Sequence, residues 1–113
     1  MRADDRVRLL HMVEACESVL RFISDRRRSD FESDQMLLYA VVRAIEVLGE
    51  AATKVSEDTR SACPEIPWSA ITDMRNRLIH GYFDIDADIV WNTASLEIPA
   101  LLSDLRRIIP AQR

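Results

Sequence analysis

The sequence predicts an all-α protein, an antiparallel bundle of four to five helices in a single domain over residues 1–113. The chain has only two glycines and four prolines, so the tight turns of β-hairpins are poorly supplied. Its apolar residues recur at spacings of three and four, which is the period of an amphipathic helix. Long helices joined by short connections then indicate a bundle.

The first helix is expected over residues 4–27. Asp4 and Asp5 suit its N-terminal end and Arg26–Arg28 its C-terminal end, because these charges complement the helix dipole. The arginine triplet is interpreted as a solvated helix end, with an RNA contact as the less favoured alternative. His11 lies beside the apolar stripe and is interpreted as a boundary side chain. The stripe consists of Leu9, Val13, Cys16, Leu20 and Ile23.

The second helix is expected over residues 34–56, with Ser33 or Asp34 as its N-cap. Phe31, in the preceding connection, is expected to pack onto the helices. Gly49 lies inside this helix and costs about 1 kcal/mol relative to alanine, which a close helix crossing would explain. The stripe consists of Leu38, Val41, Ile45, Leu48, Ala52 and Val55.

A second stripe runs along the same helix and consists of Tyr39, Arg43, Glu46 and Glu50. One interpretation is a solvated face in which Arg43 pairs with Glu46 or Glu50, worth a few tenths of a kcal/mol. The other is a polar wall beside a functional site. Periodicity alone favours the solvated face.

A third helix is expected over Pro67–Tyr82, after a loop that contains about one helical turn. Pro67 suits the first helical position, where a missing N–H costs nothing, and Gly81 is well placed to end the helix. The last helix is expected over residues 87–108, with Asp86 as a possible N-cap. Pro99 should kink or break it near residues 96–98.

Composition limits the range of functions. The net charge of −4 argues mildly against non-specific nucleic-acid binding, although it leaves room for a local phosphate site. Cys16 and Cys63 form no metal-ligand spacing, so we expect a reduced, cytoplasmic protein. We find no signal peptide and no apolar run long enough to span a membrane.

The run from Arg75 to Tyr82 gathers cationic, amide, imidazole and phenol side chains. On a continuous helix, Asn76 and His80 share a face, and so do Arg75 and Tyr82. Cleavage of RNA needs no metal, because the 2′-hydroxyl is the nucleophile. It needs a base and an acid, which histidine can supply with an ordinary pKa of about 6.5, and positive charge at the phosphate, which arginine supplies. A surface helix without a site is the alternative.

One copy of this run supplies only one histidine. Acid and base together therefore require two copies, which predicts a homodimer that brings the two runs together.

The run also resembles the Arg-x4-His-x-Tyr motif of HepT-like toxins in the HEPN superfamily. Other segments agree with that family in order: Val47–Ala52, Pro64–Trp68, Val90–Trp91 and Ile98–Leu101. The resemblance covers nearly the whole chain. It implies an all-α HEPN fold and a homodimer with a cleft between the motif helices. It also implies metal-independent endoribonuclease activity, with no cofactor.

By this resemblance, Arg75 contacts phosphate, His80 performs acid–base chemistry and Asn76 supports them, while Arg77 lies at the rim. Arg43, Glu46 and Glu50 would form a surrounding polar shell. The resemblance further implies a toxin of a type II/VII-like toxin–antitoxin system. Its cognate antitoxin would be a minimal nucleotidyltransferase that transfers AMP to Tyr82. The alternative is a non-enzymatic helical module that binds a nucleotide or a partner.

Overall fold

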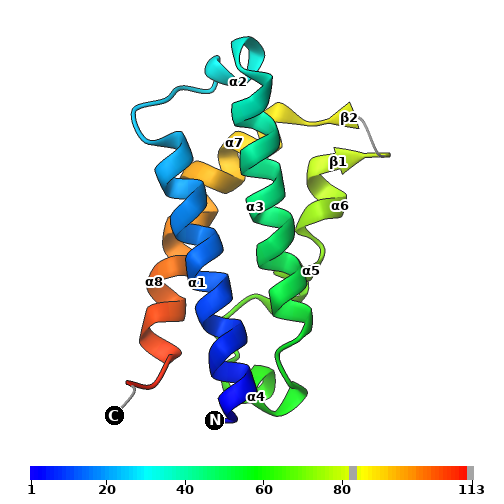
Figure 1. Ribbon diagram of the computed structural model, residues 1–113. Helices are drawn as coiled ribbons and strands as arrows, with labels where there is room; N and C mark the ends of the chain where they lie inside the picture. The colour runs from blue at the N-terminus through cyan, green and yellow to red at the C-terminus, as the bar shows by residue number, and fades with distance from the viewer. Residues whose placement is uncertain (82–83, 112–113) are drawn as a thin grey trace.

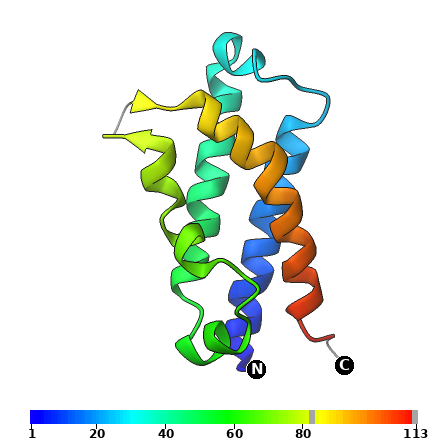
Figure 2. The same cartoon turned by 180° about the vertical axis from the view of Figure 1, so that it is seen from behind.

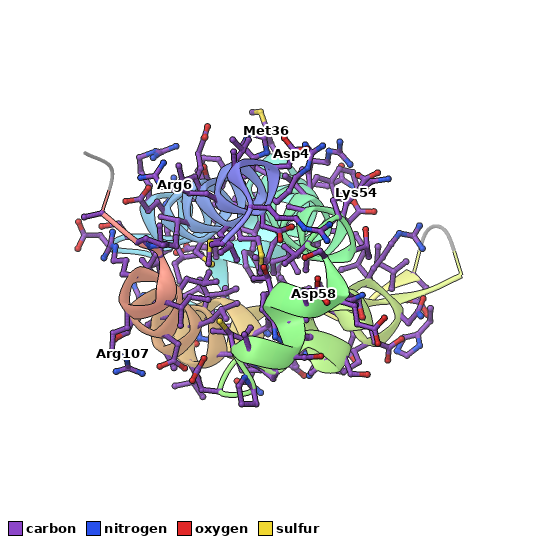
Figure 3. The ribbon with its side chains drawn as sticks, turned by 90° about the horizontal axis from the view of Figure 1, so that it is seen from below. Asp4, Arg6, Met36, Lys54, Asp58 and Arg107 are labelled. Atoms are coloured by element: carbon purple, nitrogen blue, oxygen red, sulfur yellow. The ribbon has the colours of Figure 1, made fainter. Side chains whose placement is uncertain are left out.

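Two long antiparallel helices, α1 (Ala3–Ile23) and α3 (Gln35–Thr53), lie side by side in one layer, and the helices that follow α3 in the chain cover one side of that layer (Figure 1; Figure 3). The structure is a computed structural model that describes residues 1–81 and 84–111. The described chain is helical apart from one very short hairpin, which confirms the all-α prediction. None of the described helices is long and apolar enough to cross a bilayer.

Helix α1 covers Ala3–Ile23 and is shorter than predicted at its C-terminal end. Asp25 adopts a positive φ of 60°, and the N–H of Arg26 bonds to the carbonyl of Ile23, so the helix cannot continue. Arg26–Arg28 therefore lie beyond the helix and do not form its end. Arg28 instead pairs with Asp88, a residue distant in sequence. The buried apolar residues of α1 are Leu9, Met12, Ala15, Cys16 and Val19.

Helix α2 covers Asp30–Ser33, a single turn in the segment expected to be a connection. Phe31 is buried and meets the ring of Trp91 edge to face, with 5.6 Å between the ring centroids. The prediction that Phe31 packs onto the helices is therefore confirmed.

Helix α3 covers Gln35–Thr53 and begins as predicted, because the Asp34 carboxylate accepts a hydrogen bond from the N–H of Leu37. Its predicted stripe faces the core, and all but Leu38 are fully buried. A Cβ at Gly49 would lie 3.1 Å from the carbonyl oxygen of Ile71. Gly49 thus marks a close crossing of α3 with the helix that contains Ile71, as predicted.

Helix α4 covers Glu57–Ala62 and is tied to the start of α1 by a buried carboxylate. Asp5 is only 3% exposed. Its carboxylate accepts hydrogen bonds from the N–H of Ser56 at 2.8 Å and from the hydroxyls of Ser56 and Thr59 at 2.6 Å. These bonds compensate the burial of the charge.

The predicted third helix is divided into α5, Trp68–Thr72, and α6, Met74–Leu78. The N–H of Asp73 still bonds to the carbonyl of Ser69 in α5, but the N–H of Asn76 bonds to the carbonyl of Asp73, only three residues back, so the regular helical hydrogen bonding is interrupted at this joint. The prediction of one helix to Tyr82 was wrong.

After Leu78 the chain forms a hairpin of β1, Ile79–His80, and β2, Asp84–Ile85, in which Ile79 pairs with Ile85. The carbonyl of Leu78 accepts a hydrogen bond from the N–H of Asp86 at 2.8 Å. This carbonyl therefore bonds to a residue eight positions later and does not continue the helix. Gly81 has a φ of 75° and serves the connection between the strands instead of a helix end.

The last predicted helix extends from α7, Ala87–Asn92, through a π-helical turn at Thr93–Glu97, to α8, Ile98–Ile108 (Figure 2). Its outer bounds match the prediction. The Asp86 carboxylate caps α7 by accepting from the N–H of Ile89 at 3.1 Å. The irregular turn directly precedes Pro99, which cannot donate a helical hydrogen bond, so the predicted break is confirmed.

Candidate active site

Arg75 lies on α6 and reaches across to α3. Its Nε donates to the carboxylate of Glu46 at 2.8 Å. The Arg75 side chain is 53% exposed, whereas that of Glu46 is only 25% exposed. Within the described residues, no hydrogen bond uses the terminal nitrogens of Arg75. Glu46 thus holds one edge of the guanidinium and leaves the other edge available for a phosphate.

A hollow of about 340 Å³ surrounds this ion pair. The predicted polar stripe of α3 supplies one wall of it, and the α5–α6 segment supplies the other. Arg43 and Glu50 line this hollow together with Thr72 and Arg75. Arg43 does not pair with Glu46, as one interpretation of the stripe expected, because Glu46 is engaged by Arg75. The structure therefore places Arg43, Glu46 and Glu50 of the stripe, but not Tyr39, beside Arg75.

Asn76 does not lie beside His80, where the helical spacing predicted it. Its amide Nδ2 donates to the carboxylate of Asp73 at 2.7 Å. Because the helix ends at Leu78, Asn76 and His80 do not share a helix face, and that expectation was wrong. Asn76 stabilises the joint between α5 and α6, and this joint positions Arg75, the next residue toward the N-terminus.

His80 lies on β1 with 60% of its side chain exposed, and its Nε2 is 3.9 Å from the carboxylate of Asp86. Helical spacing could not predict Asp86 as a neighbour of His80, because the β1–β2 hairpin, and not a helical turn, brings the two residues together. Asp86 had been predicted only as a helix cap. Asp86 contacts both elements: its Oδ1 accepts the capping hydrogen bond at the start of α7, and its Oδ2 lies toward the His80 imidazole.

The structure gives Arg75 and His80 separate carboxylate partners on separate elements. Arg77 points to another side, where its Nη2 lies 3.3 Å from Glu97. Tyr82 falls outside the described residues. Within the described ranges, no group of three His, Cys, Asp or Glu side chains could hold a metal ion.

Thiol chemistry has no support at either cysteine. Burial raises the pKa of Cys16 to about 12, with the nearby Glu17 carboxylate adding to the effect. Burial and the charge of Glu65 also raise the pKa of Cys63. Neither side chain forms an appreciable amount of thiolate at neutral pH. The polar groups around Arg75 and His80 remain as the candidate site.

The profile of one protein family, described as Ribonuclease HepT-like, matches residues 12–108. The chain belongs to the HepT-like ribonuclease family. This confirms the family, and the ribonuclease enzyme, expected from the resemblance of the sequence.

Known relatives match the HepT-like chain over nearly its full length. A Methanocaldococcus jannaschii protein with a provisional RNase name is 35% identical over 108 residues, covering 96% of this chain and 89% of the relative. A Thermococcus cleftensis protein named "Probable ribonuclease HepT" is 33% identical over 108 residues, covering 96% of this chain and 98% of the relative. We found no significant match among solved structures.

Proposed function

We propose that this HepT-like protein is a metal-independent endoribonuclease toxin whose site is shared between two copies of the chain. The observation that carries the proposal is the half-exposed guanidinium of Arg75, which Glu46 holds by its Nε in a polar hollow. A guanidinium presented in this way can form two hydrogen bonds with one phosphate.

In the proposed reaction, a neutral His80 removes the proton from the RNA 2′-hydroxyl, whose oxygen attacks the adjacent phosphorus. The bond from phosphorus to the 5′-oxygen breaks, and the protonated His80 of the second copy gives its proton to that leaving oxygen. The products are a 2′,3′-cyclic phosphate and a free 5′-hydroxyl. Arg75 stabilises the added negative charge on the phosphate oxygens, and Asn76 supports Arg75 from the α5–α6 joint.

The test is cleavage of labelled RNA by the purified protein in the presence of a chelator. We expect His80→Ala to lower the cleavage rate by about 10²–10⁴-fold, the usual contribution of a positioned proton-transfer group. Arg75→Ala should lower it by about 10²-fold or more. The matched control is Arg106→Ala, since Arg106 also forms a 2.8 Å ion pair with a glutamate, Glu17, on the opposite side of the bundle.

Full activity of His80→Ala would refute the proposed site. Absence of cleavage and of growth arrest by the wild-type protein would refute the toxin. That second result would favour the non-enzymatic module that binds a nucleotide or a partner.

We further propose that a minimal nucleotidyltransferase antitoxin neutralises this toxin in the cytoplasm by AMPylation of Tyr82. The phenol oxygen of Tyr82 would attack the α-phosphorus of ATP, its proton passing to a base on the antitoxin and pyrophosphate leaving. The added nucleotide brings bulk and negative charge two residues from His80, where RNA phosphate should bind.

Co-expression with the nucleotidyltransferase of a neighbouring gene tests this step. Mass spectrometry should find one or more AMP groups on the peptide that contains Tyr82, and Tyr82→Phe should abolish the modification and the protection. An unmodified peptide in a neutralised complex would show that binding alone inhibits the toxin.

A further inference from the structure

Three hollows adjoin one another along the segment from α4 to α6, which follows the bundle from the end near the N-terminus to the hairpin (Figure 1). The hollow around Arg75 shares Thr72 with a second hollow, of about 510 Å³, which Arg77 also lines. That second hollow shares Ser69 and Thr72 with a third, of about 380 Å³, beside α4. We call the second and third hollows the flanking track, because they continue the hollow of the candidate active site.

The two arginines of α6 point to different sides of that helix. Residues two positions apart on a helix are separated by about 200° around its axis. Arg75 accordingly pairs with Glu46 on α3, whereas Arg77 pairs with Glu97 of the π-helical turn. A ligand that extends from the Arg75 hollow past Thr72 therefore meets a second guanidinium in the flanking track.

The flanking track contains unsatisfied hydrogen-bond donors. In the part of the chain that the structure describes, only two buried side-chain polar atoms lack a hydrogen-bond partner, the Nε atoms of Arg60 and Arg77. Both arginines line the flanking track. Arg60 also forms no ion pair with any described residue. A buried donor without an acceptor is unfavourable, and an anion held by the terminal nitrogens of Arg60 would compensate the charge that the protein leaves unmatched.

The third hollow also contains an aromatic ring that is held in one orientation. The indole Nε1 of Trp68 donates to the carbonyl of Cys63 at 3.0 Å. Trp68 is only partly buried, and it lines the hollow together with Arg60. The indole offers a stacking surface for a nucleobase, and the guanidinium offers a positive charge for a phosphate. This combination binds single-stranded nucleic acids.

Two carboxylates also line the flanking track. Asp73 accepts from the amide of Asn76, and Glu57 lies in the first turn of α4. Together with Arg60 and Arg77 they leave the track close to neutral. A ligand that consists of phosphate alone would fit this mixture poorly, whereas carboxylates can accept hydrogen bonds from the amino groups of nucleobases. The track therefore suits a strand whose bases and phosphates both contact the protein.

We propose that the flanking track binds nucleotides that flank the cleaved bond of a single-stranded RNA, with Arg60 contacting a phosphate and Trp68 stacking on a base. This assignment rests on the proposed function, because the strand reaches the track from the hollow around Arg75. It also explains how a chain with a net charge of −4 can hold RNA, since the contacts are confined to one path.

The experiment measures how the full-length protein binds a single-stranded oligoribonucleotide of mixed sequence over a range of salt concentrations. The oligonucleotide is methylated at every 2′-oxygen, so it cannot be cleaved. We expect Arg60→Ala to weaken binding about tenfold. It should also reduce the slope of the logarithm of affinity against the logarithm of salt concentration by about 0.7, the value for one phosphate contact with a single strand. Arg27→Ala is the matched control, because Arg27 also has no ion pair with a described residue and precedes α2, at the opposite end of the bundle from α4 (Figure 1).

The fluorescence of Trp68 provides an independent measurement. The chain has two tryptophans, so Trp91→Phe leaves Trp68 as the only one. The oligonucleotide should quench this fluorescence, and Arg60→Ala should shift the quenching to about tenfold higher RNA concentrations.

An Arg60→Ala variant that binds the oligonucleotide with the affinity and salt dependence of the wild type would overturn the inference. Continued RNA cleavage by the wild type would then leave the proposed function standing. If Arg60→Ala instead lost binding to the co-expressed nucleotidyltransferase while it kept its affinity for RNA, the inference would also fail, and the track would belong to a protein partner. Conversely, the expected loss of RNA binding, together with a wild type that does not cleave the unmethylated strand, would refute the proposed function and leave RNA binding by the track intact.

Discussion

The carboxylate of Glu46 on α3 accepts a 2.8 Å hydrogen bond from Nε of Arg75 on α6, and this bond links two residues that are 29 positions apart in sequence. The pair contributes little to stability, because Arg75 is more than half exposed and such pairs are worth about 0.2–1 kcal/mol. Its consequence is geometric. It fixes the plane of the guanidinium beside the hollow and leaves the terminal nitrogens facing outward.

We expect Glu46→Ala to lower kcat for RNA cleavage by about tenfold, equivalent to roughly 1.4 kcal/mol of transition-state stabilisation. KM should change little, because Arg75 keeps its charge but loses its fixed orientation. Steady-state kinetics and urea unfolding measure the two effects separately. Glu46→Gln, which retains an acceptor, should recover part of kcat.

Glu17→Ala is the control, since it breaks the Arg106–Glu17 pair of equal length. An equal loss of kcat in Glu17→Ala would show that the effect of Glu46→Ala is a general one. A fall of several kcal/mol in the free energy of unfolding of Glu46→Ala would also contradict the positioning role, because it would show that the ion pair is mainly structural.

Gly49 controls how closely α3 approaches the segment that carries Arg75. A Cβ at this position would lie 3.1 Å from the main-chain oxygen of Ile71, which cannot move aside as a flexible side chain could. Gly49→Val should therefore destabilise the protein by about 1–3 kcal/mol, as overpacking does. It should also lower RNA cleavage, because the α5–α6 joint is displaced.

Urea unfolding followed by circular dichroism measures this loss. Met36→Val, at an exposed position of the same helix, should stay within about 0.5 kcal/mol of the wild type. An unchanged or higher stability of Gly49→Val would show that the contact relaxes freely.

The features predicted correctly from the sequence are those with local signals. The buried stripe of α3 follows from its period, and Asp34 and Asp86 act as helix caps through hydrogen bonds to residues three positions ahead. The break before Pro99 follows from its missing N–H. Gly49 also gave a correct prediction, because an unfavourable residue inside a helix needs a packing reason.

The features that were missed depend on contacts between distant residues. His80 was expected on a helix, but the carbonyl of Leu78 bonds to Asp86, eight residues later, and the chain turns into a hairpin. The partner of Glu46 was expected within its own helix, whereas the structure supplies Arg75 from another element. Helical spacing carries no signal for either contact. The assignment of Arg75 and His80 to the active site stays a prediction.

The buried carboxylate of Asp5 makes stability depend on pH. Burial acts to raise the pKa of Asp5, but hydrogen bonds from Ser56 and Thr59 and the charge of Arg2 outweigh burial and hold it below its ordinary value of 3.8. Because the folded-state pKa is lower than the unfolded-state pKa, ionised Asp5 stabilises the fold fully above pH 3.8. The stabilisation is lost as the pH falls through the folded-state pKa.

Asp5→Ala should cost about 1–3 kcal/mol at neutral pH, because it leaves buried hydrogen-bond donors without an acceptor. Urea unfolding across the acidic range should show the difference from the wild type shrinking below the ordinary pKa of an aspartate. Asp4→Ala, at an exposed neighbouring position, should show neither the loss nor the pH dependence. A difference that stays constant with pH would contradict a role for the charge of Asp5.

Asp86 connects the fold to the proposed proton-transfer group. Its Oδ1 caps α7 through the N–H of Ile89, and its Oδ2 lies 3.9 Å from Nε2 of His80. Asp86→Asn keeps an oxygen for the cap and removes the negative charge. A neighbouring carboxylate orients an imidazole. We therefore expect Asp86→Asn to lower kcat by about tenfold, with KM and stability close to those of the wild type.

Asp34→Asn is a matched control, because Asp34 caps α3 through the N–H of Leu37 in the same way but has no neighbouring histidine. It should leave kcat unchanged. Asp86→Ala, which removes cap and charge together, should lower kcat by at least as much and also destabilise the protein by about 1 kcal/mol. If Asp86→Asn cleaves RNA as fast as the wild type, the carboxylate serves only the helix, and His80 works without its help.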